Sequence, residues 1–518
     1  MLFNSYEFIF VFMPVVVGVF FLLGRSSRAW ALRWVIAASL FFYGWWRPLN
    51  VLIIAPSVLI NFALARLLQR LQMHGNPGTA KAILVLGIVF NVAFLGYFKY
   101  SNFLITSLND AFATQIVLAR IMLPLGISFI TFQKIAFLID VHAGRVESFS
   151  LRDYCLFVLF FPQLIAGPIV HYLEMMPQFH RISCQFDKEN VSVGMTLFAF
   201  GLFQKVFLAD GIAKSVTPLY QLADQGSRIG LLPAWIAAAG FTFQIYFDFS
   251  GYTDMALGVA RLFGVRLPPN FNSPLRASSI IDFWLRWHMT LTRFLTAYIY
   301  NPLTLALTRR RAMRKGSRVV ALPKGGGAFI ELLMLPTLLT MFVSGVWHGA
   351  GYTFIIWGVL HGLFLTVNHL FRLLGPKLLG DKSRYDRLMQ PTGFLITFVC
   401  VAASMVIFRA TSLKTAADLL QGMLGLHGIG FSSGMGLKTA LLWIGPLAFI
   451  ALACPNTLQL LSQYEPALGW RSVPRGATPG KTRFLWQPSL AWAAAASVIV
   501  AIGMLNLGGN SEFLYWQF

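Results

Sequence analysis

Apolar runs of nearly membrane-spanning length recur along the whole chain and are separated by short polar segments. A helix needs about 20 apolar residues to cross the hydrocarbon core of a bilayer, so each run predicts a transmembrane or re-entrant helix. The runs are Phe8–Leu23, Ala29–Trp46, Leu49–Leu68, Ala82–Phe98, Ile121–Val141, Tyr154–Val170, Val191–Leu208, Leu231–Phe249, Phe329–Val346, Tyr352–Leu370, Phe394–Phe408, Thr439–Cys454 and Pro488–Leu505. The pattern predicts an all-α polytopic membrane protein with roughly eleven to fourteen such helices. We expect residues 1–518 to form a single integral-membrane domain.

Composition supports this class. Of the 518 residues, 57% are hydrophobic and 12% are charged, whereas soluble domains carry about 25% charged residues. Met1–Glu7 contains no basic residue, so we expect the first run to be a retained span rather than a signal peptide. The four cysteines are scattered and lack the spacing of metal ligands, so no metal site is predicted from them.

The formal net charge of +22 raises the question of nucleic-acid binding. Basic residues instead cluster in short loops between apolar runs, within Arg309–Lys324, Arg372–Arg387 and Arg471–Arg483. Short basic loops are retained in the cytoplasm, where they face anionic lipid head groups. We therefore interpret the charge as a topology signal and expect membrane lipids, not nucleic acid, as partners.

One histidine stands in a strongly apolar stretch, Met341–Trp357. An imidazole at membrane depth loses its water and must be paired or functional, so His348 is a candidate site residue. The two runs around it lie between basic loops, which predicts a hairpin whose turn contains Gly345–Gly351. We expect these glycines to permit irregular backbone beside a water-accessible cavity, and we include Trp347 in the candidate site.

A second histidine belongs to an amphipathic pattern in Ser278–Leu295. At about 100° per residue, one helix face carries Trp284, Trp287, His288, Leu291 and Leu295, and the opposite face carries Asp282, Arg286 and Arg293. The pattern predicts a helix that turns His288 toward an apolar interior and pairs Asp282 with Arg286. We take His288, Trp284 and Arg286 as candidate site residues. The alternative, a histidine that is merely buried and hydrogen-bonded to backbone or water, stays open.

A third cluster lies at the end of the run Leu231–Phe249. It places Tyr246, Asp248, Ser250, Tyr252 and Asp254 within nine positions. Burying such groups is unfavourable unless they are hydrogen-bonded. We take Asp248, Ser250 and Asp254 as candidate substrate-binding residues, although a cation or proton path and a structural polar network fit the spacing equally well. Of the remaining histidines, His361 is close enough in the predicted hairpin to matter but has no motif of its own.

Three motifs occur in a fixed order and carry a family resemblance. They are Tyr246-x-Asp248-Phe-Ser-Gly-Tyr252-x-Asp254-Met, Asp282-Phe-Trp-x-Arg-Trp-His288-Met-Thr-Leu and Ser344-Gly-x-Trp-His348-Gly-Ala. Together with Met1–Ser5, Phe41–Trp46 and Pro162–Pro168, they make the chain resemble the membrane-bound O-acyltransferase (MBOAT) superfamily. Within it, the chain is similar to the bacterial branch that contains the alginate O-acetyltransferase membrane subunit. It departs from the family pattern at Leu285 and at Thr296–Ala297.

The resemblance implies a many-helix fold around a central tunnel or funnel, reached by an acyl donor from the cytoplasm and by an acceptor from the other side. It maps the family's essential histidine onto His348 and a second recurring histidine onto His288. It also implies acetyl-CoA or a related thioester as donor substrate, with no bound cofactor and no metal. The expected acceptors are hydroxyls of an extracytoplasmic polysaccharide, reached through an SGNH-type partner protein at the bacterial inner membrane.

The implied chemistry suits these residues. Transfer of an acyl group from a thioester to a hydroxyl needs a base that takes the hydroxyl proton, and a histidine with an ordinary pKa of about 6.5 suits that task. We predict this role for His348, and expect His288 to orient the donor or the oxyanion or to assist proton movement. A transporter or flippase of a lipid-linked sugar or polymer is the alternative, although the chain lacks the repeated halves with broken helices that are common in such folds.

Overall fold

The computed structural model describes residues 1–117, 121–314, 325–378, 380–430, 437–470, 485–508 and 514. These residues form helices and connecting segments and contain no β-strand, which confirms the predicted all-α class. They divide into two compact units. The first unit comprises Met1–Phe207, Phe249–Pro269 and Thr457–Gln517, and the second comprises Leu208–Asp248 and Asn270–Asn456. The assignment of residues 1–518 to one domain stays a prediction.

Seven helices in the described part of the chain are long and apolar enough to cross a bilayer. They are Glu7–Ser26, Leu49–Met73, Pro77–Phe112, Lys188–Asp224, Gly326–His348, Tyr352–Leu378 and Lys382–Arg409. Two shorter apolar helices cover Thr439–Ala453 and Leu490–Leu505. Each of these segments overlaps an apolar run predicted from the sequence. The chain is therefore a multi-pass membrane protein.

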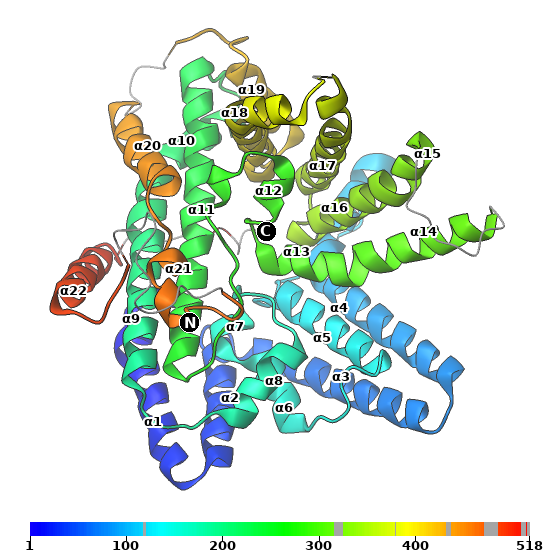
Figure 1. Cartoon of the computed structure of the whole chain (residues 1–518), viewed down its shortest axis with the longest axis vertical. Coiled ribbons are helices and arrows are strands. Elements are labelled where there is room, and N and C mark those ends of the chain that lie inside the picture. Colours follow the sequence, from blue (N-terminus) through cyan, green and yellow to red (C-terminus); the bar gives the residue numbers. More distant parts are fainter. Residues whose placement is uncertain are drawn as a thin grey trace. The chain divides into compact units, whose positions relative to one another are not determined.

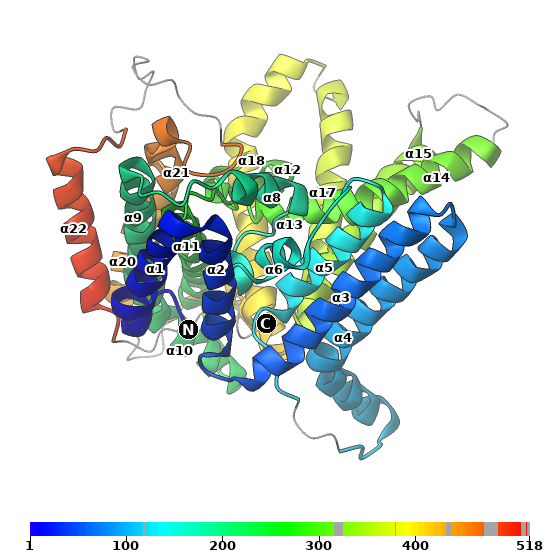
Figure 2. The ribbon, with the colours of Figure 1, turned by 90° about the horizontal axis from the view of Figure 1, so that it is seen from below.

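The first unit is built from the N-terminal helices and from two C-terminal ones (Figure 1). Its helices are α1 (Met13–Ser26), α2 (Arg28–Gly44), α3 (Leu49–Met73), α4 (Pro77–Phe112), α5 (Ile127–His142), α6 (Leu151–Leu159), α7 (Phe161–Leu164), α8 (Tyr172–Arg181), α9 (Lys188–Phe203), α21 (Thr457–Leu460) and α22 (Leu490–Leu505). Helices α3, α4 and α5 pack together as a group, α1 packs against α2, and α22 packs along α9 (Figure 2). A π-helical turn at Glu7–Phe12 precedes α1, and a 3₁₀ turn at Ser462–Tyr464 follows α21.

The prediction of a spanning helix over Tyr154–Val170 is wrong. Helix α6 ends at Leu159, Phe160 leaves helical geometry (φ −53°, ψ 108°), and α7 is a single short turn. The backbone groups at this break find other partners: the Phe161 N–H donates to the Ser39 hydroxyl (3.1 Å), and the Gln163 side chain donates to the Phe157 carbonyl (2.6 Å). The segment is apolar because it is buried inside the first unit, and hydrophobicity alone does not distinguish such a segment from a span.

Helices α9 and α11 (Leu231–Leu262) cross at two glycine pairs within the first unit. Gly194 faces Gly258 and Gly201 faces Gly251, and a Cβ added at any of the four would lie 2.5–2.8 Å from the partner's carbonyl oxygen. Small residues permit such close backbone contact between membrane helices. The contact brings Gln204, which directly follows α9, against the part of α11 that carries the third sequence motif.

The second unit contains the remaining helices. They are α10 (Asp210–Asp224), the N-terminal part of α11, α12 (Ile280–Trp284), α13 (Met289–Leu295), α14 (Asn301–Arg314), α15 (Gly326–Phe329), α16 (Leu335–His348), α17 (Tyr352–Leu378), α18 (Lys382–Arg409), α19 (Leu413–Met423) and α20 (Leu437–Leu452). Short π-helical or 3₁₀ turns at Gln204–Ala209, Pro274–Arg276, Thr296–Tyr300 and Ile330–Met334 connect several of them. Helix α17 packs against α16 on one side and α18 on the other.

The prediction of one continuous helix over Ser278–Leu295 is also wrong. His288 adopts a left-handed conformation (φ 43°, ψ 50°) between α12 and α13, and a non-glycine residue in that region interrupts a helix and is strained. The preceding segment takes up backbone groups at the break: the Met289 N–H donates to the Asn270 carbonyl (2.9 Å), and the Asn272 N–H donates to the Arg286 carbonyl (2.9 Å).

The two predicted faces of this segment are nevertheless confirmed. Its apolar residues and His288 are buried, namely Trp284, Trp287, His288, Leu291 and Leu295. Asp282 and Arg286 stay partly exposed and form the predicted ion pair, with 2.8 Å between Arg286 Nε and Asp282 Oδ1. The hydrophobic pattern therefore identified which side chains are buried, although the backbone between them is not regular.

The hairpin predicted around Gly345–Gly351 is confirmed. Helix α16 ends at His348, and α17 begins at Tyr352. A Cβ on Gly345 would lie 2.4 Å from the Phe354 carbonyl oxygen, and one on Gly358 would lie 2.4 Å from the Met341 carbonyl oxygen. The two helices therefore touch backbone to backbone, and this contact fixes the end of α16 against α17.

Replacing Gly358 with alanine is expected to destabilise the fold by about 1–3 kcal/mol, because the added methyl group overlaps the backbone of α16. The midpoint of thermal unfolding in detergent should fall. Gly18→Ala is the matched control, since no heavy atom lies within 4 Å of its added Cβ, and its midpoint should be unchanged or higher. Equal midpoints for Gly358→Ala and the parent chain would contradict this account of the hairpin.

Candidate active site

The structure brings the two predicted catalytic histidines together within the second unit. His348 is the last residue of α16 and only 4% exposed, and His288 is fully buried. Their ring centroids are 6.3 Å apart. The ring of Trp347, a third predicted site residue, lies 4.9 Å from that of His348 and 6.0 Å from that of His288. The two histidines and Trp347 therefore form one cluster of buried rings.

Aromatic side chains surround His348. The Trp357 ring of α17 lies 5.0 Å from the imidazole at an interplanar angle of 86°, and the Phe408 ring of α18 lies 5.4 Å away at 77°. Trp357 and Phe408 also contact each other, with centroids 5.2 Å apart. Edge-to-face contacts of this kind favour one ring orientation, so the surrounding helices set the position of the imidazole.

The protonation of His288 follows from its hydrogen bond to Asn270. The Asn270 side-chain oxygen accepts from the Thr290 backbone N–H (3.3 Å) and hydroxyl (2.8 Å), which fixes the orientation of the amide. The same oxygen lies 3.1 Å from His288 Nδ1, so Nδ1 must carry the proton. Burial lowers the pKa of His288 to about 3, so the ring is neutral and Nε2 is its basic nitrogen.

A third histidine, His361 of α17, is held by a chain of hydrogen bonds. The Ser404 hydroxyl donates its one proton to the Val401 carbonyl (2.7 Å), so His361 Nε2, which lies 2.9 Å from that hydroxyl, must be the donor between them. His361 Nδ1 then accepts from the Trp284 indole N–H (3.3 Å). His361 is thereby fixed as a neutral ring that anchors Trp284.

The residues of this hydrogen-bond chain contact the candidate site through their aromatic rings. The rings of Trp284 and Trp357 are 5.9 Å apart, those of His361 and Trp357 are 4.7 Å apart, and Trp357 in turn contacts His348. Trp284, predicted as a substrate-binding residue, thus belongs to the support around His348. The role of His361 was not predictable from the sequence, because its partners, Trp284 and Ser404, are distant along the chain.

Three buried polar atoms near these rings have no hydrogen-bond partner among the described residues. They are the indole nitrogen of Trp357, the hydroxyl oxygen of Ser344 and the side-chain nitrogen of Asn270. Buried donors are rarely left in this state, so these atoms are candidates for contact with a bound substrate. Sequence reasoning missed Trp357 and Asn270, while Ser344 opens the motif that contains His348.

The third sequence cluster is divided between the two units. Asp248 is buried in the second unit, at the point where α11 leaves it. Nearby on the same helix, the Tyr246 ring contacts Phe271 (6.2 Å), which contacts Trp287 (5.1 Å). These contacts link the end of this part of α11 to the segment that carries His288.

Ser250 and Asp254 belong to the first unit and form a closed hydrogen-bond network there. The Ser250 hydroxyl donates to Gln204 Oε1 (2.7 Å), and Gln204 Nε2 donates to Asp254 Oδ2 (2.9 Å) and to the Thr457 hydroxyl (3.0 Å). Of the two alternatives that the spacing left open, the geometry favours a structural polar network for these two residues. Arg286 likewise contacts Asp282 on a partly exposed face. Substrate-binding roles for Asp248, Ser250, Asp254 and Arg286 stay predictions.

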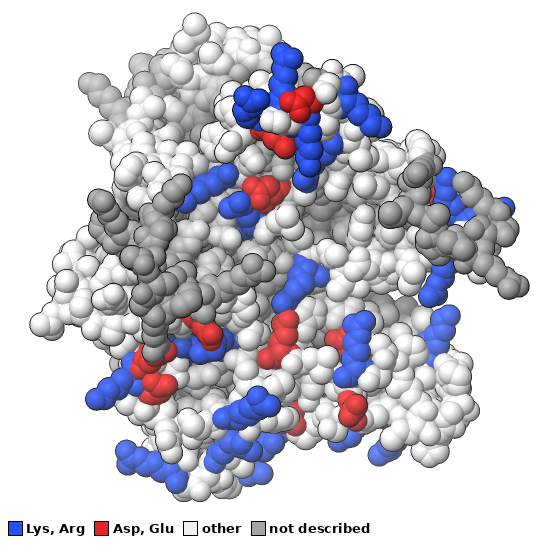
Figure 3. Space-filling model, viewed as in Figure 1, with Lys and Arg blue, Asp and Glu red and all other residues white. Residues whose placement is uncertain are grey.

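Basic side chains on the face shown in Figure 3 are scattered and often lie beside acidic ones. In the described part of the first basic loop, Arg311 pairs with Glu331 (2.6 Å) and Arg314 lies 3.8 Å from the same carboxylate group. Other basic residues of the predicted loops lie outside the described residues, namely Lys315, Arg318, Lys324, Arg471, Arg475, Lys481 and Arg483.

Comparison with known proteins gives one consistent result. Residues 83–319 match the family model described as "MBOAT, membrane-bound O-acyltransferase family". The chain is 37% identical to the peptidoglycan O-acetyltransferase of Helicobacter pylori over 461 residues, which cover 83% of this chain and 81% of that protein. It is 34% identical to the probable alginate O-acetylase AlgI of Pseudomonas aeruginosa over 100% of both chains.

A more distant similarity involves the teichoic acid D-alanyltransferase of Streptococcus thermophilus, with 28% identity over 55% of this chain and 68% of that protein. The family-model match ends before His348, but the similarity to the alginate O-acetylase extends over the full length. Full-length similarity at this level, joined to an all-helical fold with seven candidate spans, confirms the resemblance seen in the three motifs. The chain is an acyltransferase and belongs to the membrane-bound O-acyltransferase family.

Proposed function

We propose that this protein is a membrane-embedded O-acetyltransferase that takes an acetyl group from acetyl-CoA, or a related cytosolic thioester, and passes it across the bacterial inner membrane. The final acceptors are hydroxyl groups of an extracytoplasmic polysaccharide, reached through an SGNH-type partner protein. The names of the relatives support this choice, since they describe transfer to peptidoglycan, alginate and teichoic acid.

The pairing of His348 with His288 carries the proposal. A hydroxyl attacks the thioester carbonyl carbon, a C–O bond forms, the C–S bond breaks, and the hydroxyl proton must leave as attack proceeds. His348 takes this proton as general base and returns it to the departing thiolate, which leaves as a free thiol. His348 ends α16, where the negative end of the helix dipole stabilises the positive charge formed on the ring.

The neutral His288 complements this step. Its basic Nε2 belongs to a ring held in one tautomer by Asn270, so His288 positions the hydroxyl or relays its proton toward His348. The Trp357 indole N–H, a pure donor, is suited to bind the carbonyl oxygen as negative charge develops on it. The described arginines of α14 lie among the basic residues that we propose attract the phosphates of the donor. A central tunnel that joins the two sides at His348 is part of the same proposal.

His348→Ala is expected to lower acetyl transfer at least about 100-fold, since a general base contributes about 10² to 10⁴-fold. Membrane vesicles that contain the partner and polymer are supplied with labelled acetyl-CoA, and label in the polymer is counted. His74→Ala, at an exposed position after α3, is the control. Full transfer by His348→Ala would refute the catalytic assignment, and loss of polymer export would favour the transporter alternative.

Trp357→Phe removes one indole N–H while keeping an aromatic ring beside His348. If that N–H stabilises the oxyanion, turnover at saturating donor should fall about 10²-fold with little change in KM. Trp235→Phe is the matched control, because its indole N–H donates to the Met423 carbonyl (3.1 Å) away from the histidines. A rise in KM at unchanged turnover would show that Trp357 contributes only to binding.

His361→Leu should fold but lower turnover roughly tenfold. The Trp284 indole loses its hydrogen-bond acceptor, so its ring shifts against Trp357, which contacts His348. His361→Gln retains a donor for Ser404 and an acceptor for Trp284 and should restore most of the activity. His369→Leu, on the same helix, is the control and should be neutral. Failure of glutamine to perform better than leucine would show that the hydrogen-bond chain has no positioning role.

A further inference from the structure

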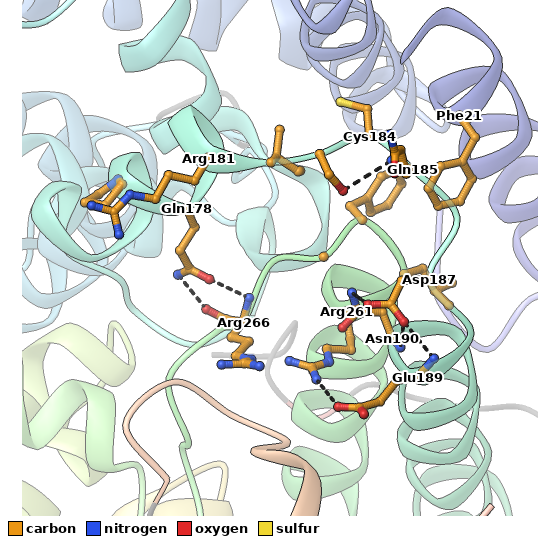
Figure 4. Close-up of a pocket in the computed structure, with 16 residues that line it drawn as sticks. Phe21, Gln178, Arg181, Cys184, Gln185, Asp187, Glu189, Asn190, Arg261 and Arg266 are labelled. Atoms are coloured by element: carbon orange, nitrogen blue, oxygen red, sulfur yellow. Dashed lines mark hydrogen bonds and ion pairs between the residues drawn. The ribbon is translucent and has the colours of Figure 1, made fainter. Parts of the chain in front are cut away.

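A polar cavity of about 410 Å³ lies in the first unit (Figure 4), whereas the histidine pair belongs to the second unit. It is enclosed by the C-terminal turns of α1, the loop between α8 and α9, the start of α9, and the end of α11. Apolar side chains such as Phe21 and Phe263 form part of its wall, and three arginines, Arg181, Arg261 and Arg266, also line it. The cavity is therefore both basic and partly apolar.

Arg261 is the buried cation of this cavity, with an exposed fraction of only 2%. Its terminal nitrogen Nη2 donates to the Tyr464 carbonyl (3.2 Å) and lies 3.8 Å from a Glu189 carboxylate oxygen. Its Nε is buried and has no hydrogen-bond partner among the described residues. A guanidinium normally binds two oxygens side by side, and here that capacity is largely unused.

The acidic residues around the cavity do not neutralise it. Asp187 is engaged at the N-terminus of α9, where it accepts from the Glu189 N–H (2.8 Å) and the Asn190 side chain (3.0 Å). Arg266 forms its ion pair with Glu465. Glu189 lies 3.8 Å from Arg261, a distance too long for a strong hydrogen bond, and Asp187 and Glu465 also act on Arg261 electrostatically. Desolvation, reinforced by Arg266, lowers the pKa of Arg261 to about 10, so the nearby carboxylates offset its burial only partly.

The cavity lies where two candidate spans end. The span Glu7–Ser26 closes just after Phe21, and the span Lys188–Asp224 begins beside Glu189. The loop between α8 and α9 is held against α1, since a Cβ on Gly24 would lie 2.4 Å from the Cys184 Cβ. Span ends lie at the level of lipid head groups. Arg25 in the last turn of α1 and Arg28 at the start of α2 indicate the cytoplasmic side.

We propose that this cavity binds a phosphate group, with Arg261 as its principal ligand and Arg266 and Arg181 as supporting cations. The phosphate is that of a membrane phospholipid whose head group enters the cavity, or a free phosphate from the cytoplasm. Glu189 competes with the phosphate for Arg261, and the apolar wall accommodates the first carbons of a lipid.

Full-length protein, delipidated in detergent, is titrated with short-chain dihexanoyl phosphatidylglycerol, with dihexanoylglycerol that lacks the phosphate, and with inorganic phosphate. Binding is followed by native mass spectrometry. Arg261→Gln should weaken binding of the phospholipid roughly tenfold, because a charge-assisted contact is lost. Glu189→Gln should strengthen binding several-fold, because the competing charge is removed. Arg33→Gln, an exposed residue of α2 outside the cavity, is the control with the same charge change as Arg261→Gln.

The two variants are expected to change binding in opposite directions. Glu189→Gln therefore still tests the proposal if Arg261→Gln fails to fold. Unchanged or weaker binding by a folded Glu189→Gln variant would overturn the proposal, and so would equal binding of dihexanoylglycerol and phosphatidylglycerol together with no binding of inorganic phosphate. Binding of inorganic phosphate with the same response to both variants would support a free phosphate as the natural ligand. Binding of phosphatidylglycerol alone, with that response, would support a lipid head group.

Discussion

In the mechanism proposed above, the chemistry depends on one imidazole, that of His348, which is held at the end of a helix and is almost fully buried. Removing a polar ring from water is unfavourable unless its surroundings compensate. Here, the aromatic rings of Trp347, Trp357 and Phe408 set its position. The backbone contact between α16 and α17 fixes the helix end that carries it. The packing of the second unit therefore determines where the base stands.

Two further histidines show how hydrogen bonds outside the reacting group tune such a site. Asn270 fixes the tautomer of His288, and Ser404 fixes that of His361. In these hydrogen-bonding arrangements each of the two rings has one protonated nitrogen, Nδ1 in His288 and Nε2 in His361. In the proposed mechanism, a neutral His288 near His348 leaves the proton of the attacking hydroxyl as the one charge that must be moved. Ser250 and Asp254 are hydrogen-bonded to Gln204 in the first unit.

Much of this arrangement was predictable from the sequence, for a physical reason. Apolar runs report burial in lipid or protein, so they revealed the helical class, the hairpin around His348 and the buried face that holds His288. They do not report backbone geometry. The break at Phe160 and the left-handed His288 depend on partners such as Ser39 and Asn270, which are far away along the chain. The glycines at positions 194, 201, 251 and 258 are visible in the sequence, but which helices they join is not. The role of His361 was hidden for the same reason.

The pH dependence of single-turnover acetyl transfer at saturating donor tests the central claim most directly. If His348 is the base, the rate in the parent protein falls in acid with the slope of a single proton, because a protonated imidazole cannot accept another. In His348→Gln the rate is far lower and this acid limb is absent. An identical acid limb in His348→Gln would show that another group takes the proton.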